Sequence, residues 1–237
     1  MHPPKKILYM KIKILLFPAF ILIVSSCKKS ESTNTPPTQQ DTIYLTTSAG
    51  STWNYHETDA SGTTPINSDY TLTSTSRDTS INGKSYHIFS NSDGSTQYFN
   101  VTGHDYYQFD SLPATLGTSI FERLYLKDNV AAATTWSQDI NVSLSGVPFP
   151  VPIIITYNIL EKGISRTVNG MNYTDVIHVG ASIHSSLIPS ASLTSDINSY
   201  YAKRYGLIEA STVVGLDFMG IVENVNIETK LVSANLL

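Results

Sequence analysis

The chain has 237 residues, of which 14% are charged and 10% aromatic, and its formal net charge is −4. A single cysteine excludes an intrachain disulfide, so the stability of the fold has to come from a hydrophobic core. The 15 Lys and Arg residues are scattered among 19 acids and form no basic cluster, which excludes the electrostatic footprint of a nucleic-acid-binding protein.

The N-terminus has the order of a secretory signal peptide. Two lysines, Lys11 and Lys13, form a basic start, and residues 14–24 form an apolar run that small residues follow. The run is about half as long as the roughly 20 apolar residues that a membrane-spanning helix needs, and Pro18 interrupts it. We therefore predict that residues 1–26 are a cleaved signal peptide.

The residues at the cleavage point resemble a lipoprotein signal. The sequence Val24-Ser25-Ser26-Cys27 resembles the lipobox of Bacteroidetes-type cell-envelope lipoproteins. The resemblance implies that the Cys27 thiol takes a diacylglycerol and that its new amine is acylated, for example with palmitate. Two or three acyl chains suffice for stable attachment, so the resemblance implies a protein held at the outer membrane, facing either the periplasm or the cell surface. Translation can start at Met1 or at Met10, and Met10 gives the signal peptide of more ordinary length.

A polar segment follows the cysteine. Residues 28–41 contain no aliphatic or aromatic side chain and cannot bury apolar surface, so residues 27–41 are predicted to be a flexible tether. Removal of residues 1–26 removes four lysines and no acid, which takes the formal charge from −4 to −8. An acidic mature chain is expected to contact the membrane through its lipid alone.

From residue 42 onward the sequence has the pattern of an antiparallel β domain. Short apolar–polar alternations are broken by turn sequences such as Asn82-Gly83 and the Asp93-Gly94 hairpin turn. The clearest predicted strands are residues 70–75, 85–90, 96–101, 120–127, 153–160, 173–179 and 222–231. The best candidates for helix are the short segments 112–117 and 192–198. We therefore predict an all-β fold with very little helix.

Several sequence marks recur in the same order in the two halves of this domain. They are Trp53, Tyr70 and Asn82-Gly83 in the first half, and Trp136, Tyr157 and Asn169-Gly170 in the second. Each Trp is expected to be a core residue that opens its half. We predict an internal duplication, about residues 42–130 and 131–237, that gives two related β-meanders forming an open barrel or a sandwich.

Motifs for catalysis and metal binding are missing. Gly180-Ala181-Ser182 is the nearest sequence to a nucleophile elbow, but it lacks the final Gly and no helix is predicted after it. The five histidines after Cys27 show neither the spacing of a zinc protease nor cysteine partners. We therefore predict no catalytic residue, no metal site and no cofactor.

Exposed aromatic residues are the candidates for ligand binding. In Tyr106-Tyr107 and Tyr200-Tyr201, adjacent side chains on a strand face opposite ways, so one of each pair is expected to be exposed. Phe149 lies among alternating prolines in residues 147–153, which predicts either an edge strand guarded against pairing or an apolar lip beside a ligand cavity. The candidate ligand-binding residues are Tyr107, Phe149 and Tyr201.

Together these features predict a membrane-anchored cell-envelope lipoprotein that acts as a non-catalytic binding or structural module. The alternative is an envelope hydrolase that acts on glycans or peptides. The expected partners are the membrane, through the N-terminal lipid anchor, and a lipid, a glycan or another envelope protein, but no nucleic acid.

Overall fold

The computed structural model describes residues 43–111, 120–144 and 146–237, and in these residues the chain forms strands and no helix. The predicted signal peptide, Cys27 and the tether lie outside the described residues. The strands are β1 (Thr52–Asp59), β2 (Ile66–Ile81), β3 (Lys84–Asn91), β4 (Thr96–Thr102), β5 (Asp105–Ser111), β6 (Ile120–Lys127), β7 (Thr135–Val142), β8 (Val151–Val168), β9 (Met171–His184), β10 (Leu193–Ala202), β11 (Gly206–Phe218) and β12 (Ile221–Asn235).

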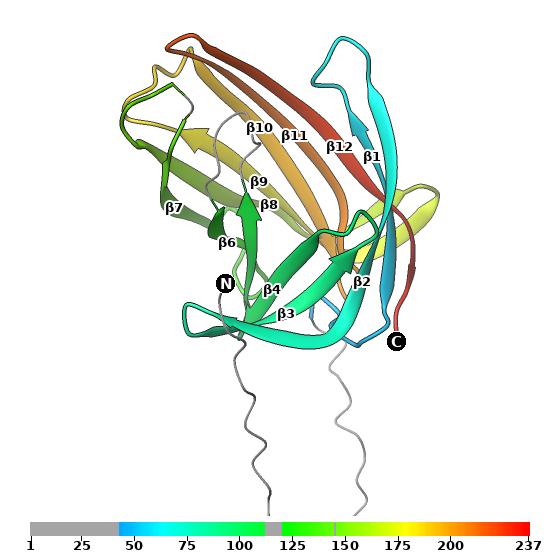
Figure 1. Cartoon of the computed structure of the whole chain (residues 1–237). Coiled ribbons are helices and arrows are strands. Elements are labelled where there is room, and N and C mark those ends of the chain that lie inside the picture. Colours follow the sequence, from blue (N-terminus) through cyan, green and yellow to red (C-terminus); the bar gives the residue numbers. More distant parts are fainter. Residues whose placement is uncertain (1–42, 112–119, 145) are drawn as a thin grey trace, which may run out of the picture. The chain divides into compact units, whose positions relative to one another are not determined.

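The twelve strands form one antiparallel sheet in the order β6-β5-β4-β3-β2-β1-β12-β11-β10-β9-β8-β7. Figure 1 shows that this sheet curls into a nearly closed barrel. Strands that are consecutive in the chain are adjacent in the sheet, except for β6 and β7, which form its two edges. The first and last strands, β1 and β12, pair with each other in the middle of the sheet. The predicted all-β antiparallel fold is confirmed, as a barrel-like sheet rather than a sandwich.

The two edge strands are joined by side chains instead of a backbone ladder. Trp136 Nε1 on β7 donates a hydrogen bond to the carbonyl oxygen of Leu124 on β6, at 2.9 Å. Gln138 Oε1 accepts from Leu124 N at 3.3 Å, and Gln138 Nε2 donates to the carbonyl oxygen of Glu122. We call this junction, formed by Trp136, Gln138, Glu122 and Leu124, the seam.

The local signals in the sequence correspond to observed elements. All seven predicted strand segments lie within observed strands. Asn82-Gly83 joins β2 to β3 and Asn169-Gly170 joins β8 to β9, with φ angles of 51° and 81° in the first turn and 49° and 81° in the second. Positive φ at both central residues is what a two-residue type I′ hairpin requires, and Asn and Gly tolerate it best.

One local prediction is wrong and another holds only in part. Residues 192–198 are predicted as a short helix but fall in strand β10 apart from Ser192, because Leu193, Ser195 and Ile197 alternate toward the inner face as a strand requires. Of the proline-rich residues 147–153, only Val151 to Ile153 are in a strand, and these three pair with β7 alone, because the pairing of β8 with β9 begins at Ile154. The candidate helix 112–117 lies outside the described residues.

Six strands fall in each predicted half of the domain. Strands β1–β6 lie within residues 42–130 and β7–β12 within residues 131–237. Trp53 and Trp136 are the second residues of β1 and β7, the first strand of each half. Trp53 is buried, and Trp136 is partly buried against the same core. The duplication itself stays a prediction.

The segment before β1 closes one end of the main core. Tyr44, Leu45 and Thr46 are all buried. The Tyr44 amide donates to the Tyr106 hydroxyl at 3.0 Å, and the Arg204 amide donates to the carbonyl oxygen of Ile43 at 2.7 Å. Residues 43–46, which we call the strap, are therefore fixed to β5 and to the β10–β11 turn.

Candidate functional site

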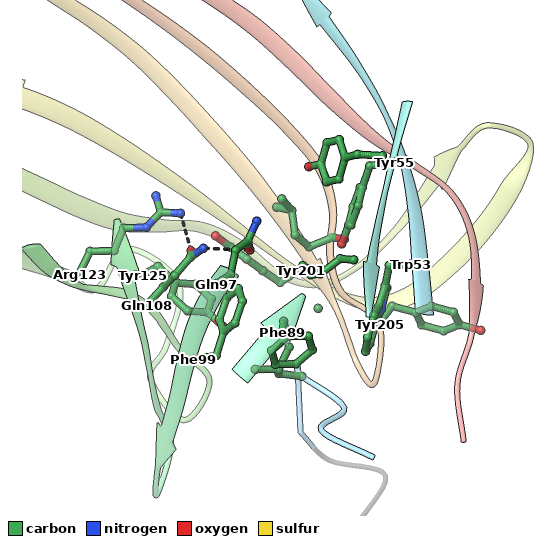
Figure 2. Close-up of a pocket in the computed structure, with 15 residues that line it drawn as sticks. Trp53, Tyr55, Phe89, Gln97, Phe99, Gln108, Arg123, Tyr125, Tyr201 and Tyr205 are labelled. Atoms are coloured by element: carbon green, nitrogen blue, oxygen red, sulfur yellow. Dashed lines mark hydrogen bonds between the residues drawn. The ribbon is translucent and has the colours of Figure 1, made fainter. Parts of the chain in front are cut away.

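A partly enclosed cavity of about 190 Å³ lies on the concave side of the sheet, where aromatic side chains converge from several strands (Figure 2). It is bordered by β1–β6, by β10, the following turn and the start of β11, and by Leu45 of the strap. The aromatic side chains of its wall are Trp53, Tyr55, Tyr70, Phe89, Phe99, Tyr125, Tyr201 and Tyr205.

Strand periodicity places these rings on one face. Trp53 and Tyr55 are two residues apart on β1, so both point to the same side of the sheet. Tyr70 is directly opposite Tyr55 on β2, and their rings stack with centroids 5.2 Å apart. Phe89 meets the Trp53 ring at 5.7 Å and the Phe99 ring at 5.0 Å. The wall is therefore a continuous layer of aromatic contacts.

A polar strip crosses the cavity on strands β4, β5 and β6. Arg123 Nη2 donates to Gln108 Oε1 at 2.8 Å, and Gln108 Nε2 donates to Gln97 Oε1 at 3.4 Å (Figure 2). The strip gives an otherwise aromatic space a row of hydrogen-bonding groups and one positive charge.

The Trp53 indole N–H is a second polar feature of the wall. Trp53 is 1% exposed, and its Nε1 atom has no hydrogen-bond partner among the described residues. A buried donor without a partner costs about 1–3 kcal/mol. The wall of the cavity therefore contains a buried donor that the described residues leave unsatisfied.

Burial keeps the phenols of Tyr55 and Tyr125 in the cavity wall neutral at physiological pH. Burial, and then the neighbouring Tyr70, Tyr201 and Tyr173, raise the pKa of Tyr55 well above its usual range. Burial also raises the pKa of Tyr125 well above its usual range. The described lining contains no Asp, Glu, His, Ser or Cys, so it supplies neither a carboxylate, an imidazole nor a usual nucleophile.

The structure separates the three predicted ligand-binding residues. Tyr201 is buried and lines the cavity, whereas Tyr200 is its partly exposed neighbour. Tyr107 lies outside the cavity lining, with Lys84 Nζ 4.0 Å from the centre of its ring. Phe149 is 43% exposed in the β7–β8 connection.

The sequence did not indicate most of the cavity residues. Strand β1, which carries Trp53 and Tyr55, was not among the predicted strands, and the glutamines on β4 and β5 look like ordinary strand residues. The spacing Trp53-x-Tyr55 could have revealed strand β1, because two large aromatic residues at period two indicate the inward face of a strand.

Another cluster has the order of a catalytic triad. His87 Nε2 lies 2.9 Å from Ser74 Oγ, and His87 Nδ1 lies 2.7 Å from Asp78 Oδ1. However, Ser74 is 1% exposed and its hydroxyl contacts the carbonyl oxygen of Thr47 at 2.9 Å, beside the strap. A substrate has no access to this oxygen in the structure, so the cluster packs the segment before β1 against β2 and β3.

Within the part of the chain that the structure describes, no group of three or more His, Cys, Asp and Glu residues is placed to hold a metal ion. The described residues also include no helix able to span a membrane.

Comparisons with known proteins give two structural matches. No protein-family model and no curated protein matches the chain. The crystal structure of a "putative lipoprotein" from Parabacteroides distasonis matches with a TM-score of 0.49 and 11% identity, over 83% of this chain and 100% of that one. A "putative exported protein with YmcC-like fold" from Bacteroides fragilis matches with a TM-score of 0.40 and 7% identity, over 82% of this chain and 99% of that one. At these identities the likeness concerns the path of the backbone and not the side chains of the cavity.

Proposed function

We propose that this protein is a membrane-anchored cell-envelope lipoprotein whose β domain is a non-catalytic binding module. The lipobox resemblance at Cys27 supports the anchor, and the aromatic cavity supports the binding role. The observation that carries the binding role is the composition of the cavity wall, which combines eight aromatic side chains with the Gln97, Gln108 and Arg123 strip. Cavities of this kind bind ligands through apolar contact and fix their orientation with a few polar groups.

The size of the cavity limits the ligand. An apolar cavity of about 150 Å³ takes benzene, whereas drug-sized ligands occupy about 300–1,000 Å³. A cavity of about 190 Å³ therefore suits one substituted ring, or the ring of a larger molecule that extends into solvent. A whole lipid or an oligosaccharide does not fit inside it.

Binding can be read from the two tryptophans of the chain. In a ¹H–¹⁵N spectrum of the labelled protein, benzyl alcohol should shift the indole signal of Trp53, which lines the cavity, and leave that of Trp136 at the seam unchanged. Leu72→Phe adds volume to the wall and should abolish the shift. Leu187→Phe is the matched control, because Leu187 is 46% exposed and outside the cavity lining. A Trp53 signal that no ring compound moves contradicts the binding role.

The non-catalytic role is tested with the same protein. Envelope-type esters, glycosides and peptides should remain intact after long incubation at high protein concentration. Turnover that disappears in Ser74→Ala would establish the hydrolase alternative instead.

The anchor has a separate test. Cys27→Ser should abolish incorporation of labelled fatty acid and release the protein from the membrane fraction, whereas the nearby Ser30→Ala should change neither. A Cys27→Ser protein that still fractionates with the outer membrane contradicts the anchor.

A further inference from the structure

The inner face of strand β1 changes from aromatic to acidic along its length. On β1 the inward residues are Trp53, Tyr55 and then Glu57. Tyr70 and Gln97 line the cavity and also a shallow depression beside it. The depression is lined by Glu57, Ser68, Asp69, Tyr70, Asn91, Ser92, Asp93 and Gln97. The aromatic cavity therefore adjoins a surface that carries three carboxylates.

Two of these carboxylates have no cationic partner among the described residues. Glu57 Oε2 is contacted by the Thr229 hydroxyl at 3.4 Å, and Asp93 Oδ1 accepts from the Ser95 amide at 2.7 Å. Asp69 differs, because its carboxylate lies 2.7 Å from His56 Nδ1. The negative charge of Glu57 and Asp93 is therefore uncompensated by Lys or Arg.

Both carboxylates act on the ring that separates the depression from the cavity. Burial raises the pKa of the Tyr70 phenol, and the charges of Glu57 and Asp93 raise it further. The Oδ1 atom of Asn91, another residue of the depression, is buried without a hydrogen-bond partner. The two carboxylates without a cationic partner in the described residues favour a ligand that brings a positive charge to the depression.

Among the described residues that line the cavity, the one cation, Arg123, lies at the end of the polar strip away from the depression. Arg123 is on β6 and donates to Gln108, whereas Glu57 is on β1 and Asp93 follows β3. Gln108 and Gln97 lie between Arg123 and the depression, and the aromatic faces of the cavity wall attract cations as well.

We propose that the cavity binds a small ring compound carrying a protonated amine, with the ring against the aromatic wall and the amine at Glu57 and Asp93. This inference rests on the proposed binding function and specifies its ligand class. A neutral ring has the same apolar contacts but gains nothing from the carboxylates, and an anionic ring is repelled by them.

Three probes of similar size that differ in charge test the proposal. Benzylammonium, benzyl alcohol and benzoate are titrated against the labelled protein, with the Trp53 indole signal as readout and that of Trp136 as internal control. For ligands this small we expect Kd values of roughly millimolar. Benzylammonium should bind about 5- to 10-fold more tightly than benzyl alcohol, the combined effect of exposed ion pairs and a cation–π contact. Benzoate should bind more weakly than both.

Charge-removing variants identify the groups responsible. The double variant Glu57→Gln and Asp93→Asn should bring the Kd of benzylammonium to that of benzyl alcohol and leave benzyl alcohol binding unchanged. Glu228→Gln is the matched control for Glu57→Gln, because Glu228 is exposed on the opposite face of β12 and outside the cavity lining. In the unaltered protein, raising the salt concentration should weaken benzylammonium binding alone, which tests the charge effect without a substitution.

The outcomes separate this inference from the proposed function. Equal binding of benzylammonium and benzyl alcohol overturns the amine preference and leaves the binding role intact. A double variant that loses benzyl alcohol as well assigns Glu57 and Asp93 to the structure of the cavity, which also overturns the preference. Failure of all three probes to move the Trp53 signal overturns the proposed function itself.

Discussion

The seam between β6 and β7 leads to a specific prediction about stability. Gln138→Leu keeps the approximate size of the side chain but removes both of its hydrogen bonds, so the Leu124 N–H and the Glu122 carbonyl lose their partners. A typical hydrogen bond contributes about 0.5–1.5 kcal/mol, and two of them about 1–3 kcal/mol. Because Gln138 is only partly buried, water can replace some of this loss, and we expect a fall of about 1–2 kcal/mol in the free energy of unfolding.

Urea unfolding measures this change, and amide exchange locates it. The Leu124 amide should exchange roughly 10-fold faster in Gln138→Leu, because its acceptor is gone. Trp136→Phe is the matched control: it frees the Leu124 carbonyl but leaves the bond to the Leu124 amide in place. A Leu124 amide equally protected in Gln138→Leu and in the unaltered protein would show that the seam bonds do not hold the edges together.

Three further predictions follow from other contacts. Ser74→Ala should lower the free energy of unfolding by about 1–2 kcal/mol, as measured in urea, because it removes the contacts of Ser74 Oγ with His87 and Thr47; an unchanged midpoint would contradict this. Gly206→Ala should lower the free energy of unfolding more than Gly170→Ala does in the same assay. Both glycines have positive φ, but a Cβ on Gly206 would lie 3.3 Å from the Tyr44 carbonyl oxygen of the strap, whereas a Cβ on Gly170 would meet open space. Equal losses in the two variants would mean that the strap moves to make room for the Cβ. Burial in the folded state raises the pKa of Tyr55 and Tyr70 above the ordinary tyrosine value of 10.0 and so favours their neutral forms; the contribution of these phenols to stability is complete below pH 10 and should be lost as pH rises above it. A spectrophotometric titration should show these phenols ionising only together with unfolding, and reversible ionisation near pH 10 in the folded protein would refute it.

The sequence predicted the features that depend on near neighbours. The Asn82-Gly83 and Asn169-Gly170 turns each bring two adjacent strands together, and their backbone requirement is met by two residues. The alternation in β12 likewise places Val225, Ile227 and Thr229 on the inner face, as their burial shows.

Features that depend on distant residues were not predictable in this way. The pairing of Thr52 with Asn235, which joins the first and last strands in the middle of the sheet, leaves no local mark in the sequence. The orientation of the Tyr200-Tyr201 pair was not predictable either. Strand alternation predicts that the two side chains face opposite sides of the sheet, but not which of them faces inward. Strand β11 has a bulge opposite Tyr200 and Tyr201. Because the extra residue of the bulge is in β11, the sequence of β10 gives no sign of it.

The pairing of β1 with β12 has a consequence for the order of folding during the export that we propose for this protein. Strand β1 begins at residue 52 and its partner ends at residue 235, so β1 waits for nearly the whole domain to cross the membrane before its second neighbour arrives. Until then its outer edge carries unpaired N–H and C=O groups, the state most open to pairing with another chain. Contacts so distant in sequence form slowly. For this protein, the interval between the emergence of β1 and that of β12 is the period when a chaperone outside the inner membrane would protect it most.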